Sequence, residues 1–227
     1  MDDSDLDRAL LTGLFEQAAL QGWDNASIAD AARAASLPLA RVRGRFPGKG
    51  AALLRFGLIA DQSALGLGAA DETPRERLFD MVMRRFDALQ HHRDGVLALL
   101  RALPRHPGTT LLLHGATLRS MRWLLDAAGV PTGGVAGALR VNGMLLVWLR
   151  GLRAWQADES EDLAGVMAAI DKALDQAVRA EAWLPFGGGS AAEAAETFEE
   201  AGLDEDPATD PPPTVPPEPP ASPPPIM

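Results

Sequence analysis

Apolar residues recur every three or four positions along residues 1–186, whereas the last 41 residues show no such period. Residues on one face of an α-helix repeat with this spacing, and no segment alternates long enough to form a strand. Leucine, alanine and arginine, which favour helices, are abundant. The pattern predicts an all-α protein, with helices expected at 5–21, 28–35, 38–46, 50–65, 73–90, 94–103, 109–128, 135–157 and 160–183.

Capping signals mark several of these boundaries. Ser27 precedes Asp30 by three residues, which is the spacing of a capping box. The segment Thr73-Pro74-Arg75-Glu76 combines a capping threonine, a proline at the first helical position and a glutamate at the third. We also expect Ser160 to cap the last helix and Trp23 to fold back onto the core.

Residues 27–49 contain two short expected helices joined by a Ser36-Leu37-Pro38 turn. This is the build of a helix-turn-helix that enters a DNA groove, and the basic residues fall on its second helix. Between Arg41 and Ala60 there is no acidic residue, and the bases are Arg41, Arg43, Arg45, Lys49 and Arg55. Such a cluster suits contacts to phosphates. The alternative is a solvated basic face whose acidic partners lie elsewhere in the fold.

Charge and proline divide the chain at about residue 186. The segment 187–227 holds nine acidic residues, no Lys or Arg, and 11 of the 18 prolines. Segments of this composition cannot offset the entropy of ordering, so we expect a disordered tail. The preceding body, with 22 acids and 21 bases, is nearly neutral. We therefore expect three segments: a DNA-binding domain at 1–50, a helical domain for ligand binding and dimerisation at 51–186, and the tail at 187–227.

Several classes of function lack their signatures. The chain has no cysteine, no HExxH or GxSxG motif and no phosphate-binding loop, so we expect no catalytic residue, metal site or cofactor. The acidic N-terminus differs from the basic start of a signal peptide. No run of 18 apolar residues occurs, so we expect a cytoplasmic protein without membrane insertion.

The expected helices at 109–128 and 135–157 carry tryptophans, methionines and polar residues on one apolar stripe. Buried polar groups need partners. A ligand is one source of such partners, which makes a candidate pocket of His114, Arg119, Trp123, Asn142 and Trp148. The alternative is an ordinary core in which intramolecular acids such as Asp126 partner most of these residues.

Residues 5–60 resemble the DNA-binding domain of TetR-family transcriptional regulators. Helix lengths and spacing agree with that family, and so does the number of helices that follow. Where the family's recognition helix carries serine, glycine and tyrosine, this chain has Pro38, Ala40 and Arg43. The matching segments are Ser27-Ile28-Ala29-Asp30-Ala31-Ala32, Ala35-Ser36-Leu37, Pro38-Leu39-Ala40-Arg41-Val42-Arg43-Gly44-Arg45-Phe46 and Lys49.

The resemblance implies a partner and a set of contacts. Ser27 and Lys49 are expected to contact phosphates of double-stranded DNA, and Arg43 stands where another phosphate contact is made. Arg41 and Arg45 are expected to reach into the groove. The resemblance also implies a homodimer through the last two helices, about 135–183, and a small apolar ligand within the helical domain.

Two alternatives remain open. Gly22-Trp23, Leu37 and Phe46-Pro47-Gly48 also resemble a lipid-binding family of ubiquinone-biosynthesis accessory proteins that shares this fold. That family's terminal amphipathic membrane helix is replaced here by the acidic tail, which an anionic membrane would repel. The third possibility is a relative that does not bind DNA and acts through protein contacts of the proline-rich tail.

Overall fold

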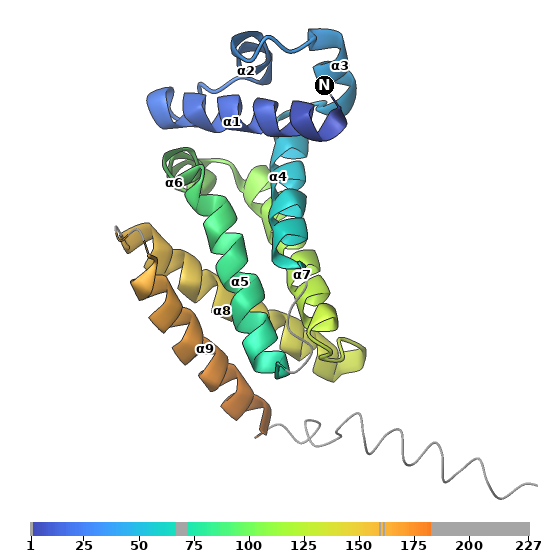
Figure 1. The fold of residues 1–227 in the computed structure, drawn as a ribbon, viewed down its shortest axis with the longest axis vertical. Coiled ribbons are helices and arrows are strands. Elements are labelled where there is room, and N and C mark those ends of the chain that lie inside the picture. Colours follow the sequence, from blue (N-terminus) through green and yellow to red (C-terminus); the bar gives the residue numbers. More distant parts are fainter. Residues whose placement is uncertain (1, 67–71, 159, 161, 183–227) are drawn as a thin grey trace, which may run out of the picture. The chain divides into compact units, whose positions relative to one another are not determined.

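The computed structural model describes residues 2–66, 72–158, 160 and 162–182 (Figure 1). These residues form nine α-helices and one short 3-10 helix and contain no β-strand, which confirms the all-α prediction. All of the helices belong to one compact unit. The expected disordered tail lies outside the described residues, and the division into domains at residue 50 stays a prediction.

Each helix begins and ends within a few residues of its expected bounds. Their bounds are α1 (Asp3–Gln21), α2 (Ile28–Ala34), α3 (Leu39–Arg45), α4 (Lys49–Ala64), α5 (Pro74–Gln90), α6 (Arg93–Ala102), the 3-10 helix η1 (Leu103–Arg105), α7 (Pro107–Ala127), α8 (Gly134–Ala157) and α9 (Ala164–Ala182).

Two of the predicted caps are present and one is wrong. The Thr73 side chain accepts from the backbone of Glu76, and the Glu76 side chain accepts in return from the backbone N–H of Thr73 at 2.8 Å. The Ser27 hydroxyl accepts from the backbone N–H of Asp30. Ser160 does not cap α9, which begins four residues later. The carboxylate of Asp158 instead accepts from the backbone N–H of Val166, at 3.1 Å, and from Ser160.

The N-terminal head consists of α1, α2 and α3. In Figure 1, α1 lies across the molecule with α2 and α3 on one side and α4 and α6 on the other. Leu6, Leu10 and Leu14 of α1 are fully buried, at the three-to-four spacing that the sequence shows. Trp23 is buried as expected, and its ring lies 6.3 Å from that of Phe15.

The remaining helices form a bundle that continues from the head through α4. Figure 1 shows α4 descending from the corner after α3 along α5 and α7, with α8 and α9 packed as a pair. At the centre, the rings of Phe86 and Trp148 stack with centroids 4.6 Å apart. Trp155 is also fully buried, and its indole N–H donates to Gln90 at 2.8 Å.

Among the described helices, α8 alone is long and apolar enough to cross a membrane by length and composition. A helix was predicted at 135–157, but without an unbroken run of 18 apolar residues it was not predicted to qualify as a membrane span. It is weak support for a membrane span, because a core helix of a bundle passes the same test. Here α8 contacts both α7 and α9 and contributes buried side chains to the core.

Gly95 determines how closely α6 approaches α1. A Cβ atom at this position would lie 2.3 Å from the backbone carbonyl oxygen of Phe15, so only glycine fits without movement of a helix. Replacement by alanine forces backbone, rather than a flexible side chain, to shift. Gly115 on α7 has the opposite setting, since a Cβ there would meet no atom within 4 Å.

We therefore expect Gly95→Ala to lower the free energy of unfolding by about 1–3 kcal/mol, the usual cost of an overpacked contact. Gly115→Ala is the matched control, and we expect it to be neutral or slightly stabilising because alanine favours a helix. Urea denaturation followed by circular dichroism measures both. Equal stability of the two variants would show that the α1–α6 contact is looser than the structure indicates.

Candidate nucleic-acid interface and ligand cavity

The exposed face of α3 is made of small residues. Val42 and Phe46 are buried against the head. At 100° per residue, Ala40 and Gly44 lie on the opposite side of the helix. Both are exposed, and a Cβ at Gly44 would meet no atom within 4 Å. Because these side chains are small, the backbone of α3 can approach a DNA groove closely on this face.

Arginines flank this small-residue face on both sides. Arg41 and Arg45 are four residues apart and so share the side of α3 toward the start of α1. Arg43 lies on the other side, where its guanidinium donates to the carbonyl of Pro47 at 2.6 Å. The structure thus divides the three arginines between two sides of one helix.

The second side forms a groove with the start of α2. An open cavity of about 580 Å³ lies between the first residues of α2 and the corner joining α3 to α4. Ser27, Arg43 and Lys49 all line this groove. The structure therefore brings together the three residues that the sequence analysis assigned to phosphates, although they lie up to 22 positions apart in the chain.

Lys49 is held in place at this corner. Its ammonium donates to the backbone carbonyl of Trp23 at 2.8 Å and lies 5.1 Å from the centroid of the Trp23 ring. Burial lowers the pKa of Lys49, and the negative charge of Asp24 opposes that shift. Lys49 therefore ties the start of α4 to the loop between α1 and α2, in addition to facing the groove.

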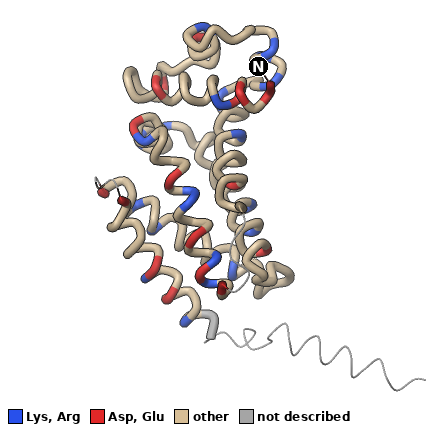
Figure 2. Tube along the Cα trace, viewed as in Figure 1, with Lys and Arg blue, Asp and Glu red and all other residues tan. Residues whose placement is uncertain are grey.

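Arg41 and Arg45 are paired with acidic residues of α1. Arg41 forms an ion pair with Asp3, and Arg45 contacts both Asp3, at 3.1 Å, and Asp7. Figure 2 shows the acidic start of α1 beside the basic α3. Arg55 of α4 also pairs with Asp7. Three of the five clustered bases thus have acidic partners distant in sequence, as the alternative interpretation of the cluster allowed.

Asp7 is fully buried between Arg45 and Arg55. Burial by itself would raise the pKa of this carboxyl group. The hydrogen bonds and positive charges of the two arginines outweigh burial, so that the pKa of Asp7 lies below its ordinary value of 3.8. The pair of acids at Asp3 and Asp7, four positions apart on α1, was the sequence signal for these partners and was not used.

A large apolar cavity of about 490 Å³ lies within the bundle, between α4, α5, α6, α7 and α8. Four of the predicted pocket residues line it: His114, Arg119, Trp123 and Trp148. Asn142 does not line it, so that part of the prediction is wrong. Its side chain lies on the exposed face of α8 and donates to the carbonyl of Ala138 at 2.8 Å.

The pocket was predicted on the premise that its polar residues are buried, and this premise is wrong for His114, Arg119 and Asn142, which are exposed. The alternative also fails for these three residues, because Asp126 accepts from Thr132 and bonds to none of them. The buried polar residues of the cavity are Asp61, Arg85 and Ser120. Each is a polar residue within an otherwise apolar helical stripe, and this pattern was the sequence signal that could have identified them as buried.

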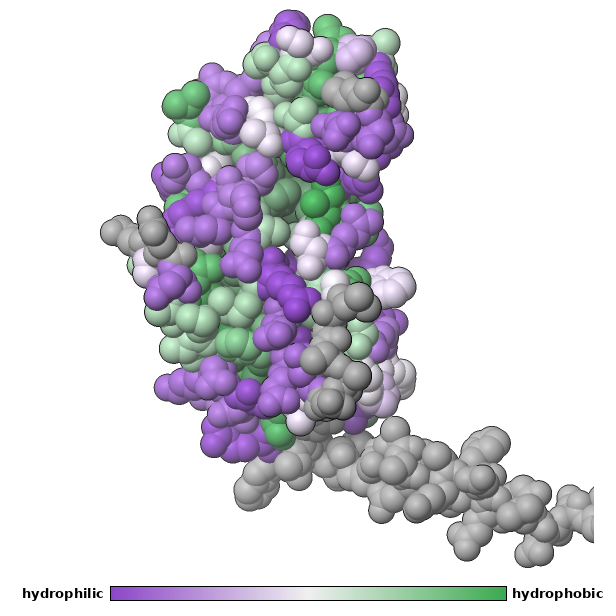
Figure 3. All heavy atoms as spheres, viewed as in Figure 1, coloured by the Kyte–Doolittle hydropathy of each residue, from purple (hydrophilic) through white to green (hydrophobic). Residues whose placement is uncertain are grey.

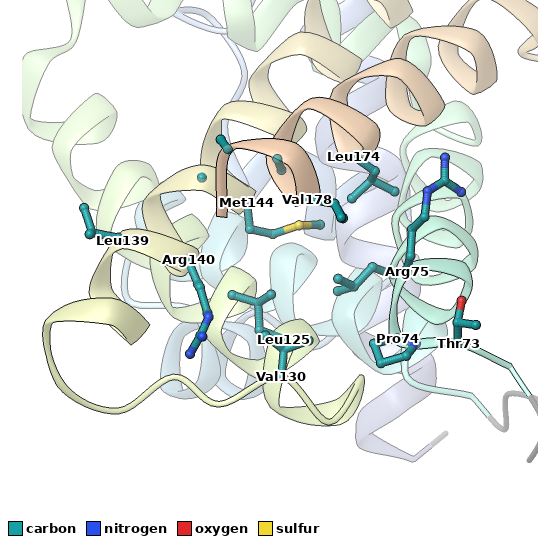
Figure 4. Close-up of a pocket in the computed structure, with 14 residues that line it drawn as sticks. Thr73, Pro74, Arg75, Leu125, Val130, Leu139, Arg140, Met144, Leu174 and Val178 are labelled. Atoms are coloured by element: carbon teal, nitrogen blue, oxygen red, sulfur yellow. The ribbon is translucent and has the colours of Figure 1, made fainter. Parts of the chain in front are cut away.

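A second cavity of about 380 Å³ lies between the start of α5, the end of α7, α8 and α9 (Figure 4). Apolar side chains converge on it, among them Leu125, Met144 and Leu174. The guanidinium of Arg75 at its edge is bound to two acids of α9, Asp171 and Asp175, at 2.6 Å each. Within the described part of the chain, no group of three acidic or histidine side chains is placed to hold a metal ion.

Comparison with known proteins finds relatives in structure but not in sequence. No protein-family model and no curated protein sequence matches the chain. A TetR transcriptional regulator from Nitrosomonas europaea ATCC 19718 aligns with a TM-score of 0.61 at 20% identity, over 79% of this chain and 99% of that one. The chain has a TetR-like fold.

Two further solved structures agree with this assignment. A tetR-family transcriptional regulator from Streptomyces coelicolor aligns with a TM-score of 0.57 at 16% identity, over 87% of this chain and all of that one. A TetR transcriptional regulator from Rhodococcus sp. RHA1 aligns with a TM-score of 0.51 at 16% identity, over 78% and 97% of the two chains. At these identities the likeness describes the fold.

The setting of Asp7 predicts a pH-dependent contribution to stability. Its pKa is lower in the folded state, so its contribution is complete above the unfolded value of about 3.8 and is lost as pH falls through the folded value. We expect Asp7→Asn to destabilise the protein by about 1–3 kcal/mol at neutral pH, because two arginines lose a buried acceptor.

Urea denaturation at pH 7 and at pH 3 tests this expectation. The difference between the wild type and Asp7→Asn should shrink at the lower pH. Glu16→Gln, on the exposed face of the same helix, is the control and should change stability little at either pH. A constant difference across this range would contradict the ionised state of Asp7.

Proposed function

We propose that this protein is a TetR-like transcriptional regulator that binds double-stranded DNA through α2 and α3. The observation that carries the proposal is the small-residue face of Ala40 and Gly44, flanked by Arg41 and Arg43, on the second helix of a helix-turn-helix. A helix with such a face fits into a major groove, and the flanking arginines reach the groove edges and phosphates. The descriptions of the three structural relatives point the same way.

The two sides of α3 have different roles in this proposal. Ser27, Arg43 and Lys49 line one open groove and bind backbone phosphates, which fixes the orientation of the head. Arg41 and Arg45 lie on the other side of α3. When the protein binds, they exchange their contacts with Asp3 for contacts at the floor of the DNA major groove. Because Asp7 remains buried beneath Arg45, we expect Arg41 to move more readily than Arg45.

A ligand in the large cavity would act on the head through α4 and α7, which line the cavity and lie next to residues of the head. Helix α4 begins at Lys49, beside the phosphate groove, and lines the cavity as far as Asp61. The loop residue Asp24 of the head binds Arg105, at 3.0 Å, and His106, just before α7. A ligand that fits one arrangement of these helices better shifts the population of head positions and thereby DNA affinity.

The paired helices α8 and α9 are the proposed dimer interface. Leu139 and Leu146, seven residues apart, are exposed on α8, and Met167 and Val178 are exposed on α9. Figure 3 shows apolar side chains gathered over α9. Association of two copies through this face would place two heads on successive half-sites, about 34–36 Å or a multiple apart.

We do not propose the lipid-binding accessory function. The corner at Phe46-Pro47-Gly48 and the apolar cavity are compatible with it. However, the flanked small-residue face of α3 has no use in a protein that only holds a lipid.

A mobility-shift assay on the DNA upstream of the protein's own gene tests the function. We expect a sequence-dependent shift whose logarithmic dependence on salt has a slope of about −4, from the phosphates that Arg43 and Lys49 neutralise in each of two subunits. Scrambled DNA of equal length is the control. Equal binding to both DNAs, or none at low salt, would remove the proposal.

Asp3 provides a sharper test of the interface, because it competes with DNA for Arg41. We expect Asp3→Asn to tighten DNA binding about two- to fivefold at low salt, the range expected for an exposed ion pair, with less effect at high salt. Glu16→Gln is the matched control: it removes the same charge from the exposed face of α1, roughly 20 Å along the helix. If both variants tighten binding equally, only net charge matters and Arg41 has no specific role.

The dimer is tested by placing a charge on its proposed interface. Leu146 is 59% exposed in the single chain, and we expect Leu146→Asp to convert the dimer to a monomer in sedimentation velocity experiments. Leu20→Asp is the control, because Leu20 is 89% exposed but lies on α1 in the head. A dimer that persists in the Leu146 variant, or is lost in the Leu20 variant, places the interface elsewhere.

A further inference from the structure

A buried ion pair lies at the wall of the large cavity. Arg85 of α5 is only 5% exposed, and its Nη1 lies 2.8 Å from Oδ1 of Asp61 on α4. The hydroxyl of Ser120 on α7 donates to the other oxygen of Asp61 at 2.5 Å. The guanidinium also lies over the ring of Trp148, 4.5 Å from its centroid. All four residues line the cavity.

The hydrogen-bonding capacity of this cluster is incomplete. Nη1 of Arg85 and Oδ1 of Asp61 lie close but lack the alignment of a hydrogen bond, so these two atoms are paired by charge. Nε of Arg85 has no acceptor among the described residues. A buried donor without an acceptor is unfavourable, and such groups are normally satisfied by protein, water or ligand. Arg85 lines the cavity, but Nε itself is shielded from solvent, so a molecule bound there supplies the acceptor once the guanidinium shifts slightly toward the cavity.

The charge of the cluster indicates which acceptor fits. Asp61 already balances Arg85, so the pair carries no net charge. Arg119 also lines the cavity, but its side chain is exposed to solvent. A carboxylate placed against the buried Arg85 would bring a second anion beside Asp61, which is strongly unfavourable. A carbonyl oxygen of a ketone, ester, amide or lactone accepts from Arg85 without adding charge.

The other residues that line the cavity indicate what the rest of the ligand is made of. The residues around the cluster are mainly leucines and aromatic side chains, which favour an apolar molecule. They come from five helices and include Leu53, Phe56, Leu89, Leu99, Leu113 and Leu145.

We propose that the bundle cavity binds a neutral, largely apolar molecule through its carbonyl oxygen, which accepts a hydrogen bond from the guanidinium of Arg85. Asp61 and Ser120 hold that guanidinium in position, and Trp148 covers its face. The regulatory meaning of this site rests on the proposed function, whereas binding itself does not depend on DNA.

Three probes that share one apolar body test the preference by isothermal titration calorimetry on the full chain. They are 4-butylacetophenone, 1-butyl-4-isopropenylbenzene and 4-butylbenzoate, which carry a ketone, a hydrocarbon group of the same shape, or a carboxylate. We expect the ketone to bind at least about tenfold more tightly than either of the others, as a hydrogen bond to a charged donor allows. Equal binding of the ketone and the hydrocarbon, tighter binding of the carboxylate, or no binding of any probe would overturn the proposal.

A variant locates the preference at Arg85. The double substitution Asp61→Asn with Arg85→Met removes both charges together and so leaves no unpaired ion. We expect it to bind the ketone and the hydrocarbon with affinities within about twofold of each other. Arg84→Met is the matched control, since the neighbouring Arg84 points away to the carbonyl of Gly66 and does not line the cavity. Retention of the full preference in the double variant would overturn the role of Arg85.

Two further measurements distinguish an unfolded variant from a failed ligand site, and a failed ligand site from a failed regulatory role. Thermal melting shows whether the double variant folds, and if it does not, the comparison of probes on the wild type decides the proposal alone. The mobility-shift assay with 4-butylacetophenone is done separately. A ketone preference without any change in DNA binding supports the site described here and counts against ligand control of the regulator.

Discussion

The carboxylate of Asp7 joins two helices of the head to α4, the first helix of the bundle. It lies on α1, is fully buried, and binds Arg45 of α3 and Arg55 of α4. A buried charge is tolerated only when partners surround it, so the positions of the three helices are fixed relative to one another by this one group. The exposed face of α3, the corner at Lys49 and the direction in which α4 enters the bundle all depend on that arrangement.

Helix α4 carries this constraint from the head into the bundle. One end is held by Asp7 through Arg55 and by the contact of Lys49 with the loop before α2. The other end carries Asp61, the partner of Arg85 in the cavity wall. A helix held only by apolar contacts would pass little movement from the cavity to the head, because its side chains can repack around a ligand. A helix anchored at both ends by charged groups moves as a rigid element.

Much of the fold followed from the sequence, because helix periods and caps are local properties. The Thr73 cap, the burial of Trp23 and the helix-turn-helix at 27–49 are of this kind. Ser160 was assigned as a cap on residue type, but the nearby Asp158, with its charged carboxylate, takes the backbone donors of α9 instead.

The sites were predicted less well, because they depend on contacts between distant segments. The pairing of Asp7 with Arg45 spans 38 positions, and that of Asp61 with Arg85 joins two separate helices, so no local pattern shows them. Asn142 was assigned to the pocket by its place in an apolar helix, yet one helical position decides whether a side chain faces a cavity or solvent.

The acids on α1 also bear on how a DNA-binding head would find its site. Asp3 and Asp7 place negative charge beside α3, and residues 1–186 as a whole, with 22 acids and 21 bases, carry almost no net charge. Long-range attraction to arbitrary DNA depends on an excess of positive charge. On the proposed function, a head with its own counterions would spend less time on unrelated sequences and would search a genome by many brief encounters rather than by long sliding.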